Sequence, residues 1–167
     1  MSSSYTITII ATVDDNNIGE STDLVIYDKD SFEEEVQEFL TDSGANNWRI
    51  DRVGNHVPEQ AGEFIAHFIK DGALNPKFWE WQELMERSAL AEEVWEAAYE
   101  LRMPPDKVEE AYEGTYNSDS DYAYEYAERT GAIDQEIRWP YTSIDWQQAA
   151  KDLDFTEENG HYFNNNW

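Results

Sequence analysis

The spacing of hydrophobic and polar residues changes along the chain, and the first stretch favours β-strands. Tyr5–Val13 is rich in Thr, Ile and Val, a composition typical of a strand. Residues 24–27 predict a second, shorter strand, and the alternating residues 48–53 (Trp-Arg-Ile-Asp-Arg-Val) predict a third. We therefore expect a small sheet in the first part of the chain.

A helix is predicted between the second and third strands. Ser31 can cap this helix, and Glu34 three residues later completes a capping-box pattern. The buried stripe of the helix would consist of Phe32, Val36, Phe39 and Leu40. We interpret residues 1–57 as a small N-terminal α+β unit.

Residues 58–103 have helical spacing throughout and are interpreted as a helical middle unit. Asn75-Pro76 is a favourable helix start, because proline suits the first helical position. The apolar residues expected to face inward are Phe64, Ile65, Phe68 and Ile69, then Phe78, Trp81, Leu84 and Met85, and finally Leu90, Val94, Ala97 and Leu101. Glutamates occupy much of the remaining helix surface.

Pro104-Pro105 ends the preceding helix and opens a C-terminal α+β unit, residues 104–167. Its predicted elements are a short helix marked by Val108, Ala111 and Tyr112, a longer helix that Ser118 or Asp119 caps and Gly131 ends, a helix at about residues 143–153 and a strand at residues 161–163. The sequence thus predicts an α+β chain of three small units.

Charge changes this picture more than any other property. The chain has 37 Asp and Glu against 11 Lys and Arg, which gives a formal net charge of −26. Its 40% hydrophobic and 14% aromatic residues are too many for a disordered acidic tail, so we expect a folded protein. Nucleic acids and anionic membranes would repel it, and we expect neither as a partner. The expected partner is a basic protein.

The sequence predicts neither export nor membrane insertion. No Lys or Arg precedes the first apolar run, as a signal peptide would require, and no apolar run approaches the roughly 20 residues that cross a bilayer. The chain has no Cys, which excludes disulfides and fits a reducing compartment. We therefore expect a cytoplasmic protein.

In the predicted helices after residue 58, acidic residues recur at spacings of three and four. Carboxylates four residues apart lie about 6 Å apart along a helix axis, and each such like-charged pair costs about 0.2–0.5 kcal/mol. The ten residues that we single out as a candidate partner-binding surface are Glu80, Glu83, Glu86, Glu92, Glu93, Glu96, Glu100, Asp121, Glu125 and Glu128. Duplex DNA carries one charge per about 1.7 Å of axis, so 26 charges correspond to about 44 Å of duplex.

Residues 108–155 carry a more specific pattern. Tyr112-Glu-Gly-Thr-Tyr116 is followed by Asn117-Ser-Asp-Ser-Asp121, by Ala123 and Ala127, by Glu128-Arg-Thr-Gly-Ala132, and later by Ile144-Asp-Trp146 and Ala149-Ala-Lys-Asp-Leu153. In order and spacing, this segment resembles the ArdA antirestriction family. That family has a Y-x-G-x-Y turn, an acidic helix ending in Thr-Gly, and a late Ile-Asp-Tyr … Arg-Asp-Leu segment. Here Trp146 stands in place of the Tyr and Lys151 in place of the Arg.

The resemblance implies an elongated, three-part α+β protein that forms a homodimer and mimics bent B-DNA. Such proteins block type I restriction-modification enzymes when a mobile element or phage enters a bacterial host. This chain would then be an inhibitor of that DNA-binding groove rather than an enzyme, without cofactor or metal. Its C-terminal aromatic residues Tyr162, Phe163 and Trp167 would either supply the dimer contact or pack in the core.

Two other functions fit the same charge. One is a mimic or acidic binding module for a different basic partner, such as a CRISPR effector, a histone-like protein or a repressor. The other is a salt-adapted protein of unrelated function, including an enzyme, which predicts a pocket of convergent polar groups and evenly spread charge. A DNA mimic predicts a one-sided negative ridge instead. No His pair has metal-ligand spacing, and no glycine-rich phosphate loop is present in the sequence.

Overall fold

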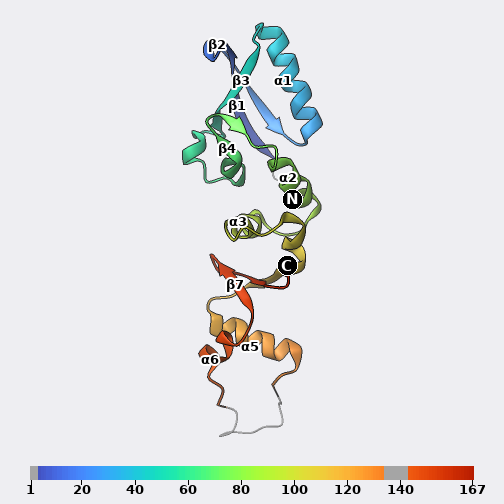
Figure 1. The fold of residues 1–167 in the computed structure, drawn as a ribbon, viewed down its shortest axis with the longest axis vertical. Coiled ribbons are helices and arrows are strands. Elements are labelled where there is room, and N and C mark those ends of the chain that lie inside the picture. Colours follow the sequence, from blue (N-terminus) through green and yellow to red (C-terminus); the bar gives the residue numbers. More distant parts are fainter. Residues whose placement is uncertain (1–3, 134–142) are drawn as a thin grey trace. The chain divides into compact units, whose positions relative to one another are not determined.

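The computed structural model describes residues 4–133 and 143–167 and has an α+β fold (Figure 1). Within these residues, helices are combined with three small antiparallel sheets, which confirms the predicted α+β class. The chain divides into two compact units, Met1–Glu92 and Glu93–Trp167. The sequence instead predicts divisions after residues 57 and 103, and that finer division stays a prediction.

The sheet of the first unit is antiparallel and has the strand order β2-β1-β3. Its strands are β1 (Tyr5–Val13), β2 (Asn16–Ile26) and β3 (Asn47–Val53). Ile7 and Ile9 of the central strand are fully buried, because alternate residues of a strand face the same side. Asp14 and Asp15, with φ of 48° and 65°, form the two-residue turn between β1 and β2. β2 therefore extends well beyond the predicted residues 24–27.

Helix α1 (Lys29–Ser43) confirms the predicted helix, but its predicted cap is wrong. Asp28 is the N-cap, and its carboxylate accepts hydrogen bonds from the Ser31 N–H and the Ser31 hydroxyl, both at 2.8 Å. These two bonds stabilise the ionised form and lower the pKa of Asp28 below its ordinary value. Gly44 ends the helix in the left-handed conformation, with φ of 68°.

Residues 58–103 are not helical throughout, which corrects the prediction. The elements in this stretch are η1 (Pro58–Gln60), η2 (Phe64–Phe68), β4 (Ile69–Lys70), β5 (Ala73–Leu74), α2 (Phe78–Arg87) and α3 (Glu92–Glu100). Asp71 and Gly72 have φ of 53° and 78°, a conformation that turns the chain between β4 and β5 and that an α-helix excludes. Phe64, Ile65 and Phe68 are buried as predicted, but from a 3-10 helix.

The segment after residue 58 packs against the first sheet to complete the core of the first unit. The Ile50 N–H of β3 donates to the Gly72 carbonyl at 2.7 Å, which ties the β4-β5 hairpin to that strand. Phe78 lies with its ring centroid 5.9 Å from Tyr5 and 5.5 Å from Phe68. Helix α2 begins at Phe78 rather than at the predicted Asn75-Pro76, and the Asn75 side chain accepts the Lys77 N–H at 3.0 Å.

The second unit contains a sheet of order β6-β8-β7 and several short helices. Its elements after α3 are η3 (Pro105–Lys107), α4 (Val108–Ala111), β6 (Tyr112–Thr115), α5 (Asp119–Thr130), α6 (Trp146–Lys151), β7 (Phe155–Glu158) and β8 (His161–Asn164). Ser118 caps α5 and Gly131 ends it, both as predicted. Tyr112 was predicted in the short helix, but α4 ends at Ala111 and Tyr112 begins β6. The predicted helix at residues 143–153 is shorter, and β6 and β7 were not predicted.

Aromatic side chains form the core of the second unit. Tyr122 stacks on Tyr162 with ring centroids 5.0 Å apart, and Tyr116 packs edge-on against both rings. Burial raises the pKa of Tyr122 to about 12, because the ionised phenol would be poorly solvated there. Tyr162 and Phe163 are therefore core residues, whereas Trp167 remains 40% exposed.

Among the described helices, none combines the length and the apolar character that crossing a membrane would require.

Candidate functional site: acidic helix faces

The negative charge is divided equally between the two units. The first unit has 19 Asp and Glu against 6 Lys and Arg, and the second has 18 against 5, so each carries −13. The charge is therefore a property of each unit and does not belong to a terminal tail.

Helix α3 arranges three of the predicted glutamates along one face. Successive residues of a helix are rotated by about 100°, so Glu93, Glu96 and Glu100 fall within an arc of about 60°. Glu93 and Glu100 are exposed and Glu96 is half-buried. The buried residues Val94, Trp95 and Ala98 lie on the other side, and the small buried Ala97 borders the acidic face. The predicted row on α3 is therefore a single helix face.

Glu92 at the start of α3 has a different environment. It is half-buried, and its Oε1 accepts a hydrogen bond from the Phe64 N–H at 3.1 Å. That amide lies at the beginning of η2, where no earlier turn supplies an acceptor. Glu92 therefore has a structural role in the first unit, which the spacing pattern could not reveal.

Helix α2 exposes Glu80, Glu83 and Glu86, all of which were predicted. Glu83 and Glu86 each interact with a side chain one helical turn away. Arg87 forms an ion pair with Glu83 at 2.6 Å, and the Gln82 side-chain amide donates to Glu86 at 3.2 Å. The positive charge of Arg87 offsets part of the row on α2.

Helix α5 presents Asp121, Glu125 and Glu128 within an arc of about 60°, and all three are exposed. The Tyr124 hydroxyl donates to Glu128 at 2.7 Å, and this bond raises the pKa of Tyr124. Arg129 at the end of α5 forms an ion pair with Glu113 of β6, which directs its charge away from the row. The three predicted residues therefore form one continuous acidic face.

Helix α1 carries an acidic row that the sequence analysis missed. Asp30, Glu34, Glu38 and Asp42 follow each other at spacings of four residues, and all four are exposed. The same helix also carries Glu33 and Glu35. The sequence could have predicted this row, because the helix was predicted and the four-residue spacing of its acidic residues is visible in the sequence.

The linear charge of α1 approaches that of one DNA strand. The helix has 15 residues and six carboxylates, so at about 1.5 Å per residue it carries one carboxylate per roughly 4 Å. A single strand of duplex DNA carries one phosphate per about 3.4 Å. Helix α3, with four glutamates in nine residues, has a similar density. These helices are rigid anionic rods with nearly the charge spacing of a phosphate backbone.

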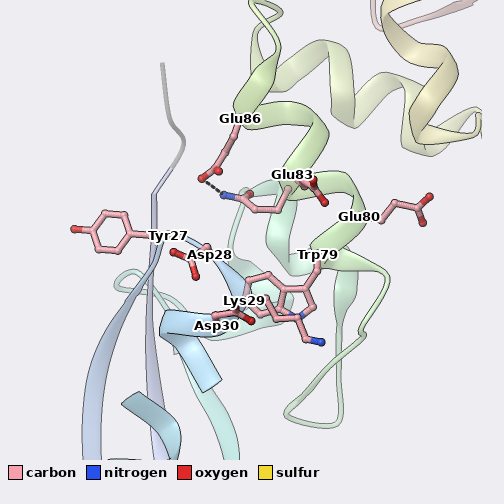
Figure 2. A pocket seen from close by; sticks show the side chains of 9 residues that line it. Tyr27, Asp28, Lys29, Asp30, Trp79, Glu80, Glu83 and Glu86 are labelled. Atoms are coloured by element: carbon pink, nitrogen blue, oxygen red, sulfur yellow. Dashed lines mark hydrogen bonds between the residues drawn. The ribbon is translucent and has the colours of Figure 1, made fainter. Parts of the chain in front are cut away.

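An acidic pocket of about 380 Å³ lies in the first unit between the start of α1 and helix α2 (Figure 2). Its lining consists of Tyr27, Asp28, Lys29, Asp30, Trp79, Glu80, Gln82, Glu83 and Glu86. Figure 2 shows the Glu80 side chain directed away from Glu86, which accepts the hydrogen bond from Gln82. Within residues 4–133 and 143–167, no group of three or more His, Cys, Asp or Glu side chains is placed to hold a metal ion.

The structure thus brings the predicted residues together in three separate helix faces, on α2, α3 and α5, and adds a fourth on α1. Eight of the ten predicted residues are exposed, while Glu92 and Glu96 are half-buried. No protein-family model and no curated protein matches this chain.

Proposed function

We propose that this protein is a DNA mimic that binds the DNA-binding groove of type I restriction-modification enzymes and so protects incoming mobile-element or phage DNA. The observation that carries the proposal is the set of carboxylate rows on rigid helices, in which helix α1, counted over all its faces, has a linear carboxylate density close to the phosphate density of one DNA strand. Such rows occur in both units, which each carry −13.

The physical basis is the exchange of one polyanion for another. A DNA-binding groove holds basic side chains, and its affinity for DNA comes largely from charge neutralisation. A folded acidic helix offers the same charge without the ordering cost that a disordered acidic tail would incur. Complementary charge also speeds the encounter of the two proteins.

The choice of type I enzymes as the partner rests on the sequence of residues 108–155. This segment resembles the ArdA pattern and includes helix α5 with its row Asp121, Glu125 and Glu128. The Y-x-G-x-Y turn of the pattern corresponds to β6 and the residue that follows it, where Gly114 has φ of 126°. The resemblance thus supports the function through the same segment that carries the second unit's acidic face.

The proposal is tested by competition with DNA. Purified protein is added to a type I modification enzyme bound to fluorescent target DNA, and displacement is followed by anisotropy at several salt concentrations. We expect stoichiometric displacement that weakens as salt rises. Unchanged DNA binding at molar excess would rule the function out, and equal displacement from an unrelated DNA-binding protein would favour a general mimic.

A pair of variants separates row geometry from net charge. The row variant Asp30→Asn, Glu34→Gln, Glu38→Gln, Asp42→Asn removes four charges from α1. The control variant Asp14→Asn, Asp15→Asn, Glu20→Gln, Asp71→Asn removes four exposed charges outside the helices of the same unit. We expect the row variant to lose about tenfold in inhibition and the control variant to lose much less. Equal losses would show that charge alone matters and that the rows have no special role.

A further inference from the structure

The first unit also has an apolar groove of about 580 Å³ beside the acidic pocket. Residues of α1, β3, β5 and α2 line it. The apolar members of its lining are Phe32, Val36, Trp48, Ala73, Leu74, Pro76 and Trp79, and the polar members include Lys29, Glu33, Gln37 and Asn47. The phosphate backbone of DNA is uniformly charged and polar, so imitation of DNA does not explain an apolar groove on this protein.

The groove has an aromatic floor that is held in place by packing. The Phe32 ring lies 5.6 Å from Trp48, edge to face, and 5.4 Å from Trp79, measured between ring centroids. Phe32 is 6% exposed, whereas both tryptophans are half-buried and accessible from the groove. Fixed aromatic rings bind an apolar side chain at low entropic cost, because they need not reorganise.

The groove and the acidic pocket are adjacent, because Lys29 and Trp79 line both cavities. On the pocket side, the carboxylates are Asp28, Asp30, Glu80, Glu83 and Glu86. Among the described residues of this lining, Lys29 is the one basic side chain. The composite surface is therefore an apolar trough with a strongly anionic neighbour.

Lys29 lies at the junction and forms an exposed ion pair with Glu33. Its ammonium is 3.6 Å from Glu33, and both side chains are more than half exposed. Ion pairs of this kind contribute little, at most about 1 kcal/mol. A partner cation can replace Lys29 at this position without a large cost.

We propose that this composite surface is a docking site for a protein segment in which one large apolar side chain is flanked by arginines or lysines. The apolar side chain lies in the groove against Trp48 and Trp79, and the flanking cations face the acidic pocket and Glu33. The carboxylates that line the pocket attract a basic segment, so charge complementarity selects a basic partner for this site. The inference rests on the proposed function only for the partner's identity, and it adds a contact that DNA cannot make.

The test uses the whole protein and two synthetic heptapeptides at physiological ionic strength. One peptide has a leucine flanked on each side by two arginines, and the matched peptide has serine instead of leucine. Binding is followed by NMR through the indole N–H signals of Trp48 and Trp79. Burial of the leucine should make the first peptide bind about tenfold more tightly than the second. Equal binding of both peptides, or no shift of these two signals, would overturn the proposal.

Two variants with matched controls sharpen the result. Ala73→Gln fills the exposed edge of the groove and should abolish the difference between the peptides, while Asn46→Gln, outside the lining, should preserve it. Lys29→Gln removes the competing cation and should strengthen binding of both peptides more than Lys70→Gln, which removes the same charge elsewhere.

If the peptides do not bind as expected while DNA displacement succeeds, the docking site is wrong and the proposed function stands. If the reverse holds, the docking site stands for another partner.

Discussion

The two units carry equal charge but use their carboxylates differently. In the first unit, the row on α1 stands on the surface of a helix whose buried side packs with an aliphatic and aromatic core. In the second unit, carboxylates hold the fold together, because Asp119 accepts the Tyr162 hydroxyl at 2.8 Å and Glu113 pairs with Arg129. Structural carboxylates occur in both units, but those described in the first unit, Asp28 and Glu92, accept backbone N–H groups, whereas Asp119 of the second unit bonds the aromatic core itself.

The largest effect that we expect from this difference appears at alkaline pH. Burial raises the pKa of Tyr116, Tyr122 and Tyr162, and the hydrogen bond to Asp119 raises that of Tyr162 further. The unfolded chain releases these protons near pH 10, whereas the folded unit retains them. The stability is thus present below pH 10 and is lost as pH rises through the folded values. The second unit should unfold first, as NMR signals of both units recorded against pH would show.

Tyr162→Phe provides the control for the alkaline experiment, because it removes one ionisable hydroxyl from the same core. Its loss of stability above pH 10 should be smaller than that of the natural protein. If both units of the natural protein unfolded at the same pH, the proposed difference between the units would be wrong.

A medium effect is expected for Asp119→Ala, which deprives the buried Tyr162 hydroxyl of its acceptor. An unsatisfied buried hydroxyl costs about 1–3 kcal/mol, so the free energy of unfolding of the second unit should fall by that amount. Asp121→Ala is the matched control, because Asp121 lies in the same first turn and is exposed. Denaturant unfolding measures both variants. Equal losses would show that the helix N-terminus, rather than the tyrosine, is what Asp119 stabilises.

The smallest effect is a gain. Glu34→Gln with Glu38→Gln removes the three repulsive pairs at four-residue spacing in α1 and should stabilise the first unit by about 1 kcal/mol at low salt. The corresponding change in α5, Glu125→Gln with Glu128→Gln, should gain less, because Glu128 accepts the Tyr124 hydroxyl. Thermal melts at low and physiological ionic strength measure the stability of both variants.

The melting temperature of the natural protein should rise with salt, because screening relieves the repulsion between the carboxylates. A melting temperature that does not change with salt would contradict the repulsive role of the rows.

Local signals predicted the elements whose ends are set by their own residues. Helix α5 is bounded by Ser118 and Gly131, because a hydroxyl cap and a left-handed glycine act within one turn of each end. Residues 58–74 were mispredicted because their helical spacing was overridden by the turn at Asp71 and Gly72 and by pairing with β3. Helical periodicity alone does not distinguish an α-helix from buried 3-10 turns and a short hairpin.

The sequence predicted the acidic chemistry of the candidate site, but only some of the residues that form it. The faces on α3 and α5 follow directly from spacing, and so does the missed row on α1. The pairing of Glu83 with Arg87 was also visible as a four-residue spacing. The role of Glu92 was not, because its partner Phe64 lies 28 residues earlier and is brought near only by folding. The groove beside α1 likewise depends on tertiary packing.

Strand β2 lies at an open edge of the first sheet, since the strand order is β2-β1-β3. An exposed edge of 11 residues is ordinarily a template on which other chains add strands and aggregate. Here two copies that met along β2 would bring Glu20 and Asp23 of each together, within proteins that already repel one another. The negative charge thus also opposes aggregation through β2. A variant from which many carboxylates are removed should aggregate by pairing of β2 strands between copies.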